Sequence, residues 1–484
     1  MRICLIASEA APLAKTGGLA DVAAALTKHL HRAGHDVRLY MPLYSRVDRS
    51  KLDLYPVEFL HDVPLELGTH RFRFSVLTAP LPGSRAPVYL IDCPALYARR
   101  GIYSADADEH LRFLALTRAA LECLQRMGWS PDILHCNDWH TAFGPLFLKA
   151  MYERDRLFKT TRSVLTIHNI GYQGIFPAQA AGDLGLGPRA NLLHQDDLRA
   201  GRVNSLKHGI IYADAITTVS PTYAREIRTD QYGMGLQDVL RARTETMIGI
   251  LNGVDYDEWD PRRDRYLPKH YDPDSLDVKR ELKRQFAERL QLSLGERTAL
   301  AGIVTRMTVQ KGLELLFDAL PGTLAKRDLA FVALGSGDAH YERFFMQLQR
   351  QFPGRVLYHR GFSDERAHWI EAASDMFLMP SLYEPCGLNQ MYSLRYGTVP
   401  IVRRTGGLAD SVELYEPSTR QGTGILFNDF NGSAMSWALN VALDLYAQPE
   451  HWRQMVLNGM RKDFSWDRQG AEYVALYERL RRSL

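Results

Sequence analysis

The first 41 residues, MRICLIASEAAPLAKTGGLADVAAALTKHLHRAGHDVRLYM, indicate the fold of this chain most directly. The short apolar run Arg2–Ala7 predicts a buried strand, and Asp36–Met41 predicts a second one. Between them, Ala20–Ala33 carries apolar residues at helical spacing, and Gly34 is a typical helix stop. A strand, a helix and a second strand in this order indicate a βαβ unit of a parallel sheet.

The same alternation of short apolar runs and longer amphipathic stretches continues along the chain in two series. The first series adds predicted strands at Ile133–Cys136, Val164–Ile167 and Ala215–Val219, and the second has predicted strands at Leu300–Thr305, Leu329–Leu334, Val356–Arg360, Met376–Met379 and Val399–Val402. Between the two series, Asn252–Ser275 is rich in Asp, Pro and Arg without clean periodicity, which predicts an irregular linker. We therefore expect an α/β protein with two doubly wound, Rossmann-like domains. Because ligands of such sheets bind at the carboxyl ends of the strands, the expected site is a cleft between two facing domains.

The composition is that of an ordinary globular protein. The chain has 484 residues, a formal net charge of +3, and 46% hydrophobic and 24% charged residues. These values argue against intrinsic disorder and against a dedicated nucleic-acid or membrane-surface binder. No run of about 18 apolar residues is present to span a membrane, and the run Ile3–Ala7 is too short for a signal peptide. The five cysteines lack CxxC spacing, so no disulfide framework or zinc site is indicated, and we expect a reducing, cytoplasmic setting.

One hexapeptide occurs twice in the chain: TGGLAD forms Thr16–Asp21 and again Thr405–Asp410. Each copy follows a predicted strand and opens a predicted helix. One interpretation is two glycine turns with coincidental neighbours. The other is that both copies are loops at helix N-termini, with exposed N–H groups suited to an anion or to sugar hydroxyls. Lys15 before the first copy would add a positive charge for a phosphate, although a solvated loop lysine is the simpler alternative.

Charged residues follow two predicted strands of the second series. Arg306 and Lys311 come after the first strand of that series, at the place where a pyrophosphate is expected. The two cations would neutralise a leaving diphosphate without a metal, although on their own they are read more simply as surface cations. Glu384 precedes a proline, which favours an extended backbone. The N–H groups around Gly387 and Leu388 would then point to a phosphate or hydroxyl.

Polar residues also end two predicted strands of the first series. Asp138 follows one of them and the pair His168-Asn169 follows the next, so we expect a shared pocket, although a lone histidine is usually structural. Three DxD triplets lack a nearby histidine and are interpreted as turn carboxylates, so no metal site is inferred. Cys386 lies at a predicted helix start without an assigned base, and we interpret it as structural rather than nucleophilic.

Seven motifs in sequence order resemble those of bacterial glycogen synthases and the related starch synthases. They are KTGGLADV at Lys15–Val22, HCNDWHT at His135–Thr141, TIHNIGYQG at Thr166–Gly174, GILNGVD at Gly249–Asp255, RMTVQKG at Arg306–Gly312, EPCGLNQ at Glu384–Gln390 and RRTGGLAD at Arg403–Asp410. The resemblance spans nearly the whole chain and implies a GT-B fold. It implies an N-terminal, acceptor-side domain at residues 1–251, a donor-side domain at residues 252–460, and a helix at residues 461–484 that crosses back to the first domain.

The resemblance also implies an activity and a set of site residues. The implied reaction transfers glucose from ADP-glucose to the non-reducing end of glycogen or another α-1,4-glucan with retention of configuration, with no metal or other cofactor and no nucleic-acid or membrane partner. Arg306 and Lys311 would hold the diphosphate, and Glu384 would bind glucose hydroxyls. The other implied donor and sugar contacts are Lys15, Gly17, Gly18, Asp21, Asp138, His168, Asn169, Asn252, Tyr358 (stacked on adenine), Cys386, Gly387, Leu388 and Asn389.

The sequence departs from the wider family pattern at two positions and leaves two alternatives open. Tyr392 stands where the broader retaining GT-B pattern has a second glutamate, and Asn389 stands where many relatives carry threonine. Both departures concern the recognition of the ribose. The first alternative is another GT-B nucleotide-sugar transferase, such as a sucrose-synthase-like enzyme. The second is a non-catalytic glucan-binding protein, which would be expected to lose Lys15, Arg306, Lys311 or Glu384. No carboxylate is placed as an obvious nucleophile, which favours front-face attack.

Overall fold

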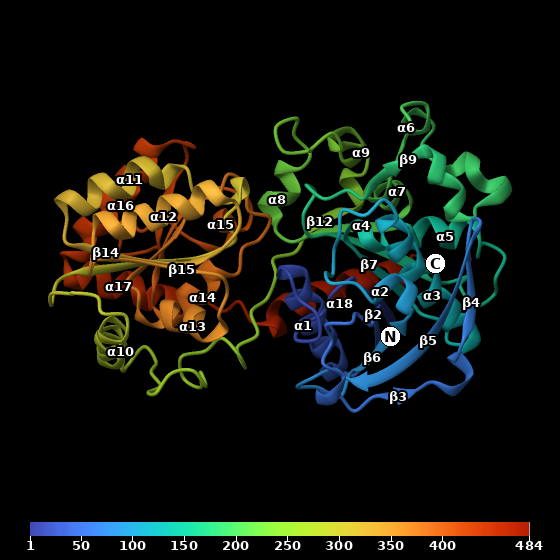
Figure 1. Ribbon diagram of the computed structural model, residues 1–484, viewed down its shortest axis with the longest axis horizontal. Coiled ribbons are helices and arrows are strands. Elements are labelled where there is room, and N and C mark those ends of the chain that lie inside the picture. The colour runs from blue at the N-terminus through green and yellow to red at the C-terminus, as the bar shows by residue number, and fades with distance from the viewer. Residues whose placement is uncertain (484) are drawn as a thin grey trace. The chain divides into compact units, whose positions relative to one another are not determined.

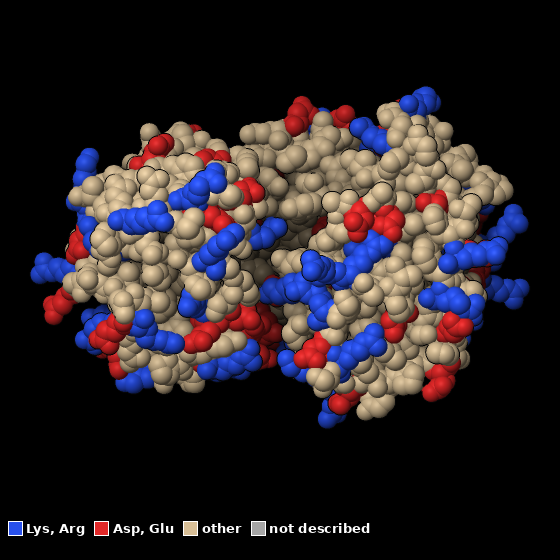
Figure 2. All heavy atoms as spheres, in the orientation of Figure 1, with Lys and Arg blue, Asp and Glu red and all other residues tan. Residues whose placement is uncertain are grey.

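The computed structural model describes residues 1–483, which form two compact units (Figure 1). One unit comprises Met1–Gly253 together with the chain from Trp466 onward, and the other comprises Val254–Ser465. The boundaries therefore lie at 253/254 and 465/466, rather than at the expected 251/252 and 460/461. On the face shown in Figure 2, cationic and anionic side chains are interspersed over both units, in keeping with the small net charge.

The first unit is built on a ten-stranded sheet with the order β12-β11-β8-β7-β1-β2-β6-β5-β3, in which β4 pairs with β5. Its strands are β1 (Arg2–Ile6), β2 (Asp36–Pro42), β3 (Tyr55–Pro56), β4 (Val63–Leu67), β5 (His70–Pro80), β6 (Pro87–Asp92), β7 (Ile133–Asn137), β8 (Arg162–Ile167), β11 (Ala215–Thr218) and β12 (Met247–Gly249), beside a separate pair β9 (Ile175–Pro177) and β10 (Arg202–Asn204). Its helices are α1 (Gly18–Arg32), α2 (Pro94–Tyr97), α3 (Glu109–Arg126), α4 (Asp138–Thr141), α5 (Gly144–Ala150), α6 (Gln195–Arg199), α7 (Ser205–Tyr212), α8 (Pro221–Glu226), α9 (Gln237–Arg241) and α18 (Trp466–Arg482). The strands from β12 to β6 are parallel, which confirms the predicted sheet.

The centre of this sheet is buried on both faces. Ile3 of β1 lies opposite Val37 of β2 and Ile133 of β7, and all three side chains are almost fully buried. A strand that is covered on both faces has a continuous run of apolar residues, which is why β1 could be predicted from the sequence. The C-terminal helix α18 packs on this unit, where the hydroxyl of Tyr477 lies 2.7 Å from Nδ1 of His135.

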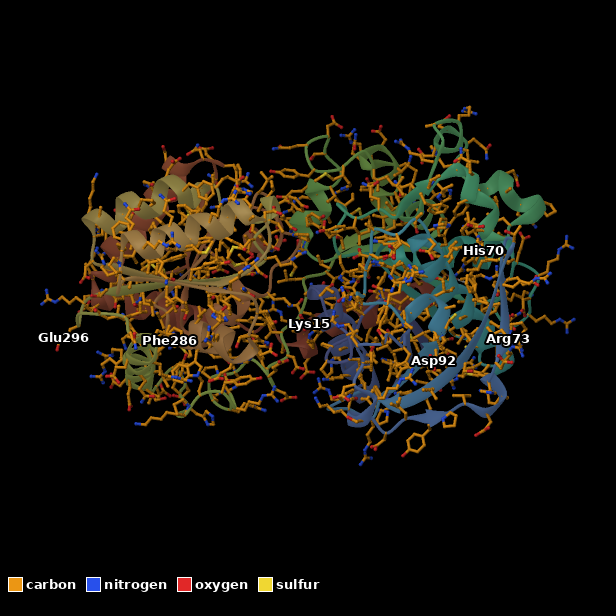
Figure 3. The ribbon with its side chains drawn as sticks, in the orientation of Figure 1. Lys15, His70, Arg73, Asp92, Phe286 and Glu296 are labelled. Atoms are coloured by element: carbon orange, nitrogen blue, oxygen red, sulfur yellow. The ribbon has the colours of Figure 1, made fainter. Side chains whose placement is uncertain are left out.

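The antiparallel edge of the same sheet was not predicted from the sequence. Strands β4, β5 and β6 form an antiparallel meander, and the short strand β3 also pairs antiparallel with β5. Only one face of β4 is buried, and β5 carries exposed polar residues such as His70 and Arg73, which Figure 3 shows on the outer strands. These strands therefore contain fewer apolar residues than strands that are buried on both faces, and the sequence pattern was too weak to identify them.

The second unit is built on a six-stranded, wholly parallel sheet with the order β15-β14-β13-β16-β17-β18. Its strands are β13 (Ala299–Val304), β14 (Leu329–Gly335), β15 (Val356–Arg360), β16 (Met376–Met379), β17 (Val399–Arg403) and β18 (Ile425–Phe427). Its helices are α10 (Leu276–Arg289), α11 (Leu315–Lys326), α12 (Ala339–Gln351), α13 (Asp364–Ala373), α14 (Asn389–Tyr396), α15 (Gly406–Ser411), α16 (Gly432–Tyr446) and α17 (Pro449–Met460). Helices cover both faces of the sheet (Figure 1), so this unit is also doubly wound, as predicted.

The predicted linker has no regular secondary structure. Between β12 and α10 the chain contains no helix or strand, apart from one isolated bridge from Val254 to Ser465. All five cysteines are buried, and none of them forms a disulfide bond within residues 1–483. None of the helices in residues 1–483 combines the length and the apolar character that crossing a membrane requires.

Candidate active site

The first TGGLAD copy forms an open loop at the start of α1. Gly17 is the N-cap of this helix and has an extended backbone, and a Cβ atom added to it would meet nothing within 4 Å. Lys15, which Figure 3 labels beside α1, lies 2.7 Å from Asp21 through its Nζ atom. The loop therefore places a cation, a carboxylate and accessible backbone together at the carboxyl edge of the first sheet.

Glu9 is a site residue that the sequence reading missed. It follows the carboxyl end of β1 and is only 3% exposed. Burial raises the pKa of Glu9, while hydrogen bonds from Thr16, Gly17 and Tyr103 act in the opposite direction. Its position directly after a buried strand was a usable signal, but the contact to Tyr103 spans 94 residues and is not visible in the sequence.

Asp138, His168 and Asn169 lie together, as expected of residues that follow neighbouring strands. Oδ1 of Asp138 accepts hydrogen bonds from the backbone N–H of His168 at 2.7 Å and of Asn169 at 3.3 Å. Burial raises the pKa of Asp138 to about 7, against the effect of these two bonds. Burial lowers the pKa of His168 to about 3, so its ring is neutral, and its Nε2 lies 2.9 Å from Oδ1 of Asn137. The cluster joins a titratable carboxylate to a neutral imidazole.

A surface hollow of about 500 Å³ opens beside these residues in the same unit. Its lining residues are Trp139, Gly171, Tyr172, Gln173, Gly174, Ile175 and Met234. The ring of Trp139 packs directly against Gly174, where an added Cβ atom would lie 2.2 Å from the ring. Tyr172 is 55% exposed. The sequence reading did not single out these aromatic side chains, which offer flat faces of the kind that pack on sugar rings.

Asn252 also belongs to the first unit, at its last residues before the linker. It is 4% exposed, and its buried Oδ1 has no hydrogen-bond partner. A buried polar atom left unpaired is costly, so this oxygen is suited to a donor supplied by a ligand.

In the second unit, the loop that carries Arg306 packs closely on the chain after β14. A Cβ atom at Gly335 would lie 1.9 Å from the carbonyl oxygen of Thr305, and one at Gly337 would lie 2.3 Å from that of Met307. Gly335 and Gly337 therefore allow these two backbone segments to approach each other closely. Arg306 itself is exposed at the carboxyl edge of the sheet.

Lys311 and Glu384 form a largely buried ion pair. Their Nζ and Oε2 atoms lie 2.7 Å apart, and the hydroxyl of Ser381 donates to the same Oε2 at 2.9 Å. Gly312 makes this possible: its φ is +61°, and a Cβ atom there would lie 2.1 Å from the carbonyl oxygen of Pro380. The structure thus joins two residues that are 73 positions apart at the carboxyl ends of β13 and β16.

The second TGGLAD copy has a different use from the first. Gly406 and Gly407 are buried, and the N–H of Gly407 donates to the carbonyl oxygen of Glu384 at 3.1 Å. A Cβ atom at Gly406 would lie 1.8 Å from the same oxygen, and one at Gly407 would lie 2.1 Å from that of Cys386. The expectation that both copies expose N–H groups to a ligand is therefore wrong for the second copy, which supports the backbone of the Glu384 loop.

Three further predicted residues, Gly387, Leu388 and Asn389, come shortly after Glu384 in the chain, and Tyr358 lies on β15. Gly387 has a φ of +72°, and Leu388 is the N-cap of α14. The side-chain amide of Asn389 donates to the carbonyl oxygen of Val304 at 2.7 Å, at the end of β13. The hydroxyl of Tyr358 donates to the carbonyl oxygen of Gly335 at 3.0 Å. Each unit therefore gathers its own predicted residues at the carboxyl edge of its parallel sheet.

Tyr392, at the place of the second glutamate in the broader pattern, is part of an aromatic stack. Its ring lies parallel to that of Trp259 with the centroids 3.9 Å apart, and Trp259 stacks in turn on His368 at 3.7 Å. Residue 392 therefore contributes an aromatic ring to this stack, and it supplies no carboxylate to the site. Within residues 1–483, no group of three or more His, Cys, Asp and Glu side chains is arranged to hold a metal ion.

Comparisons with known proteins agree with the motifs. Residues 2–242 match the starch synthase catalytic domain, and residues 285–457 match the glycosyl transferases group 1. The chain is 40% identical to the glycogen synthase of Thermotoga maritima, covering 99% of both chains. It is 44% identical to that of Thioalkalivibrio sulfidiphilus, covering 99% of this chain and 100% of the relative.

Solved structures extend the agreement to the fold. The catalytic domain of starch synthase IV from Arabidopsis thaliana, bound to ADP and acarbose, is 36% identical with a TM-score of 0.92 and 99% coverage of both chains. A sucrose-phosphate synthase from Thermosynechococcus elongatus, 17% identical with a TM-score of 0.63, shares the fold alone. Because relatives that are more than 40% identical match nearly end to end, the resemblance seen in the motifs is confirmed, and the chain belongs to the glycogen synthase and starch synthase family of GT-B glycosyltransferases.

Proposed function

We propose that the protein transfers glucose from ADP-glucose to the non-reducing end of an α-1,4-glucan such as glycogen, with retention of configuration. The observation that supports this most directly is the pair of Lys311 and Glu384, which places a cation and a hydrogen-bonding carboxylate side by side at the carboxyl edge of a parallel sheet. Such an edge is where nucleotide ligands of this fold bind. The cation suits a diphosphate and the carboxylate suits sugar hydroxyls.

Departure of ADP increases the negative charge on the phosphates, and this charge needs stabilisation. Arg306 and Lys311 supply it in the proposed mechanism, because cations already in place at the developing charge lower the barrier. The glucosyl group develops oxocarbenium-like character at the same time. No carboxylate of the site has the role of an enzyme nucleophile in our proposal. The acceptor hydroxyl attacks C1 from the face that the diphosphate leaves, the bond from C1 to the phosphate oxygen breaks, and the hydroxyl proton passes to an oxygen of the departing phosphate.

The first unit contributes the remaining donor contacts in this proposal. Lys15 and the backbone at Gly17 and Gly18 approach the donor phosphates and sugar. The neutral ring of His168 and the carboxyl of Asp138 bind sugar hydroxyls. The buried Oδ1 atom of Asn252 accepts a hydrogen bond from a hydroxyl of the same sugar. We place the reaction in the reducing cytoplasm, a setting that suits five buried cysteines without a disulfide bond in residues 1–483.

We propose the hollow around Trp139 and Tyr172 as part of the glucan acceptor path. An aromatic side chain that is half exposed at a hollow provides a flat apolar face for a pyranose ring, while nearby backbone groups bind its hydroxyls. The acceptor would then approach through the first unit, and the nucleotide would be held mainly by the second.

A panel of nucleotide sugars with glycogen as acceptor tests the proposal. Released nucleoside diphosphate and elongated glucan are both measured, with Glu384→Gln as the inactive control. We expect ADP-glucose to support elongation. A tenfold preference for UDP-glucose would favour another GT-B transferase, and glucan binding without transfer from any donor would favour a non-catalytic glucan-binding protein.

A further inference from the structure

The tip of the Lys15–Gly18 loop is held by one buried carboxylate. Oε2 of Glu9 accepts a hydrogen bond from the N–H of Thr16 at 2.5 Å, and the hydroxyl of Thr16 lies 3.0 Å from both carboxylate oxygens. Thr16 itself is exposed, so its fixed position comes from these bonds rather than from burial.

The base of the same loop is closed without Glu9. The N–H of Ala14 donates to the carbonyl oxygen of Ala10 at 3.0 Å, and the N–H of Ala11 donates to that of Ala20 at 3.0 Å. Loss of the carboxylate would therefore release the tip and leave the base in place.

Tyr103 fixes Glu9 from the other side. Its hydroxyl donates to Oε1 of Glu9 at 2.8 Å and lies 2.8 Å from the hydroxyl of Ser8. Its ring stacks on that of His140, with the centroids 4.8 Å apart. Among residues 1–483, the donors to Glu9 come from the loop tip and from this tyrosine, so the carboxylate links the two.

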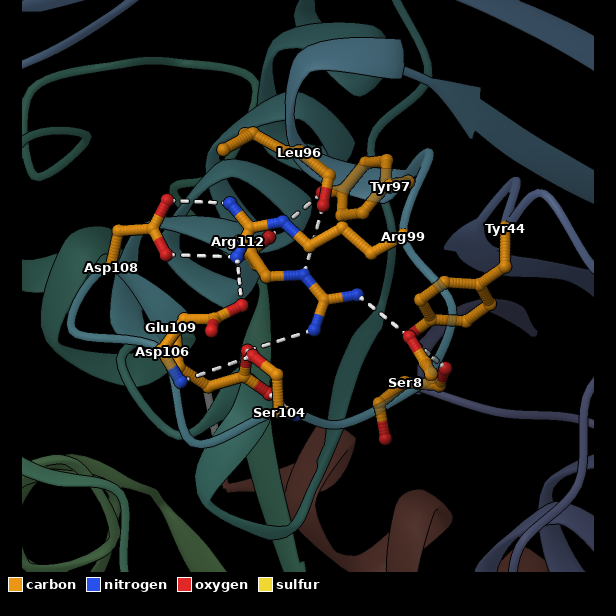
Figure 4. Close-up of polar contacts among 11 residues, drawn as sticks. Ser8, Tyr44, Leu96, Tyr97, Arg99, Ser104, Asp106, Asp108, Glu109 and Arg112 are labelled. Atoms are coloured by element: carbon orange, nitrogen blue, oxygen red, sulfur yellow. Dashed lines mark hydrogen bonds and ion pairs between the residues drawn. The ribbon is translucent and has the colours of Figure 1, made fainter.

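The segment that carries Tyr103 is itself clamped at both ends (Figure 4). Arg112, which is fully buried, donates to the carbonyl oxygens of Leu96 at 2.9 Å and Gly101 at 3.4 Å. The N–H and hydroxyl of Ser104 donate to Glu109 at 3.0 and 2.6 Å. The chain from Gly101 to Ser104 is therefore a fixed support.

We propose that Glu9 is a positioning residue for the nucleotide-sugar donor, which transmits the fixed geometry of Tyr103 to the loop through Thr16. The inference rests on the proposed function, in which Lys15 and Gly17 contact the donor. A buried carboxylate is stable only when hydrogen bonds satisfy its oxygens, so Glu9 and the loop tip hold each other in one arrangement. Because the loop is already ordered, donor binding does not have to offset the entropy lost on ordering it.

Three variants remove single contacts of this link: Thr16→Val, Glu9→Gln and Tyr103→Phe. We expect each to lower kcat/KM for ADP-glucose by about tenfold or more, which corresponds to about 1.4 kcal/mol, with the KM for glycogen changed less than twofold. The double variant Glu9→Gln/Thr16→Val should be no worse than Glu9→Gln alone, because both act through one contact.

Glu371→Gln is the matched control. Glu371 is a buried carboxylate that accepts a hydrogen bond from Ser393 at 2.7 Å. It lies in the last turn of α13, shortly before β16 begins, whereas Glu384 follows the end of that strand. This variant should change thermal stability and leave the KM for ADP-glucose unaltered.

Amide hydrogen exchange and ADP titration test the contact between Glu9 and Thr16 without requiring glucosyl transfer. In Glu9→Gln, the Thr16 amide should exchange faster and the Kd for ADP should rise. Additive losses in the double variant, unchanged exchange at Thr16, or a fall in kcat with unchanged donor affinity would each overturn the proposal. A wild-type protein that binds ADP but does not elongate glucan would reject the proposed function, while exchange and ADP affinity would still decide the role of Glu9.

Discussion

At the scale of single residues, the proposed function assigns the two cations of the second unit, Arg306 and Lys311, to the leaving diphosphate. Because they act on charge that grows as ADP leaves, Arg306→Ala and Lys311→Ala should each lower kcat by about 10²–10³ and leave the KM for glycogen unchanged. Lys326→Ala, at an exposed lysine of α11 in the same unit, is the control. Steady-state kinetics decide the matter, and near-wild-type kcat in both site variants would refute the assigned role.

Asp138 gives a prediction about pH and stability. Burial raises its pKa from 3.8 to about 7, so folding favours its protonated form. The stability that this protonation contributes is complete below about pH 4 and is lost as the pH rises towards 7. Asp138→Asn removes the titration and retains a residue that tolerates the φ of +53°. Denaturant unfolding should show the wild type losing stability relative to the variant between about pH 4 and 7; a difference independent of pH would contradict this.

Residues in contiguous motifs could be identified from the sequence, and residues that act through distant contacts could not. Lys311 and Glu384 follow strands and stand next to glycine or proline, so their type and place were informative. The role of Glu9 depends on Tyr103, whose position is set by a fully buried arginine on another element. No local pattern reports such a contact.

At the scale of elements, the two identical hexapeptides predict opposite responses to one substitution. Gly406→Ala would place a Cβ atom 1.8 Å from the carbonyl oxygen of Glu384 at a φ of +45°, so it should destabilise the protein by about 2 kcal/mol or more. Gly17→Ala meets nothing within 4 Å and has an extended backbone, so it should fold normally and lose donor affinity. Thermal unfolding and ADP titration separate the two, and equal melting temperatures would contradict the assignment.

The parallel strands could be predicted and the antiparallel meander could not. Strands such as β1 and β13 are covered on both faces and read as continuous apolar runs. In β4 only alternate residues are buried, and in β5 only Phe74, Val76 and Ala79 are buried, while charged residues such as Arg71 and Arg73 are exposed. Sequence patterns therefore located the elements that carry the site better than those that complete the edge of the sheet.

At the scale of the whole molecule, the proposed donor contacts come from two units. Lys15 belongs to one and Lys311 to the other, with chain crossings at 253/254 and 465/466. If one ADP-glucose molecule touches both, its binding must favour a closed arrangement, with hinges expected at residues 252–261 and 460–467. Small-angle scattering should show a smaller radius of gyration with ADP and a maltooligosaccharide. An unchanged radius, from a starting state shown to be open, would refute closure.

The most direct test of the central claim follows the new glycosidic bond itself. Proton NMR of the protein with ADP-glucose and maltotriose, in excess EDTA, reports the released ADP and the anomeric signal of the added glucose together. We predict one α-1,4-linked glucose at the non-reducing end for each ADP released, and no signal above background with Lys311→Ala. A β-linked product, free glucose without elongation, or activity that returns only when a metal ion is added would contradict the account.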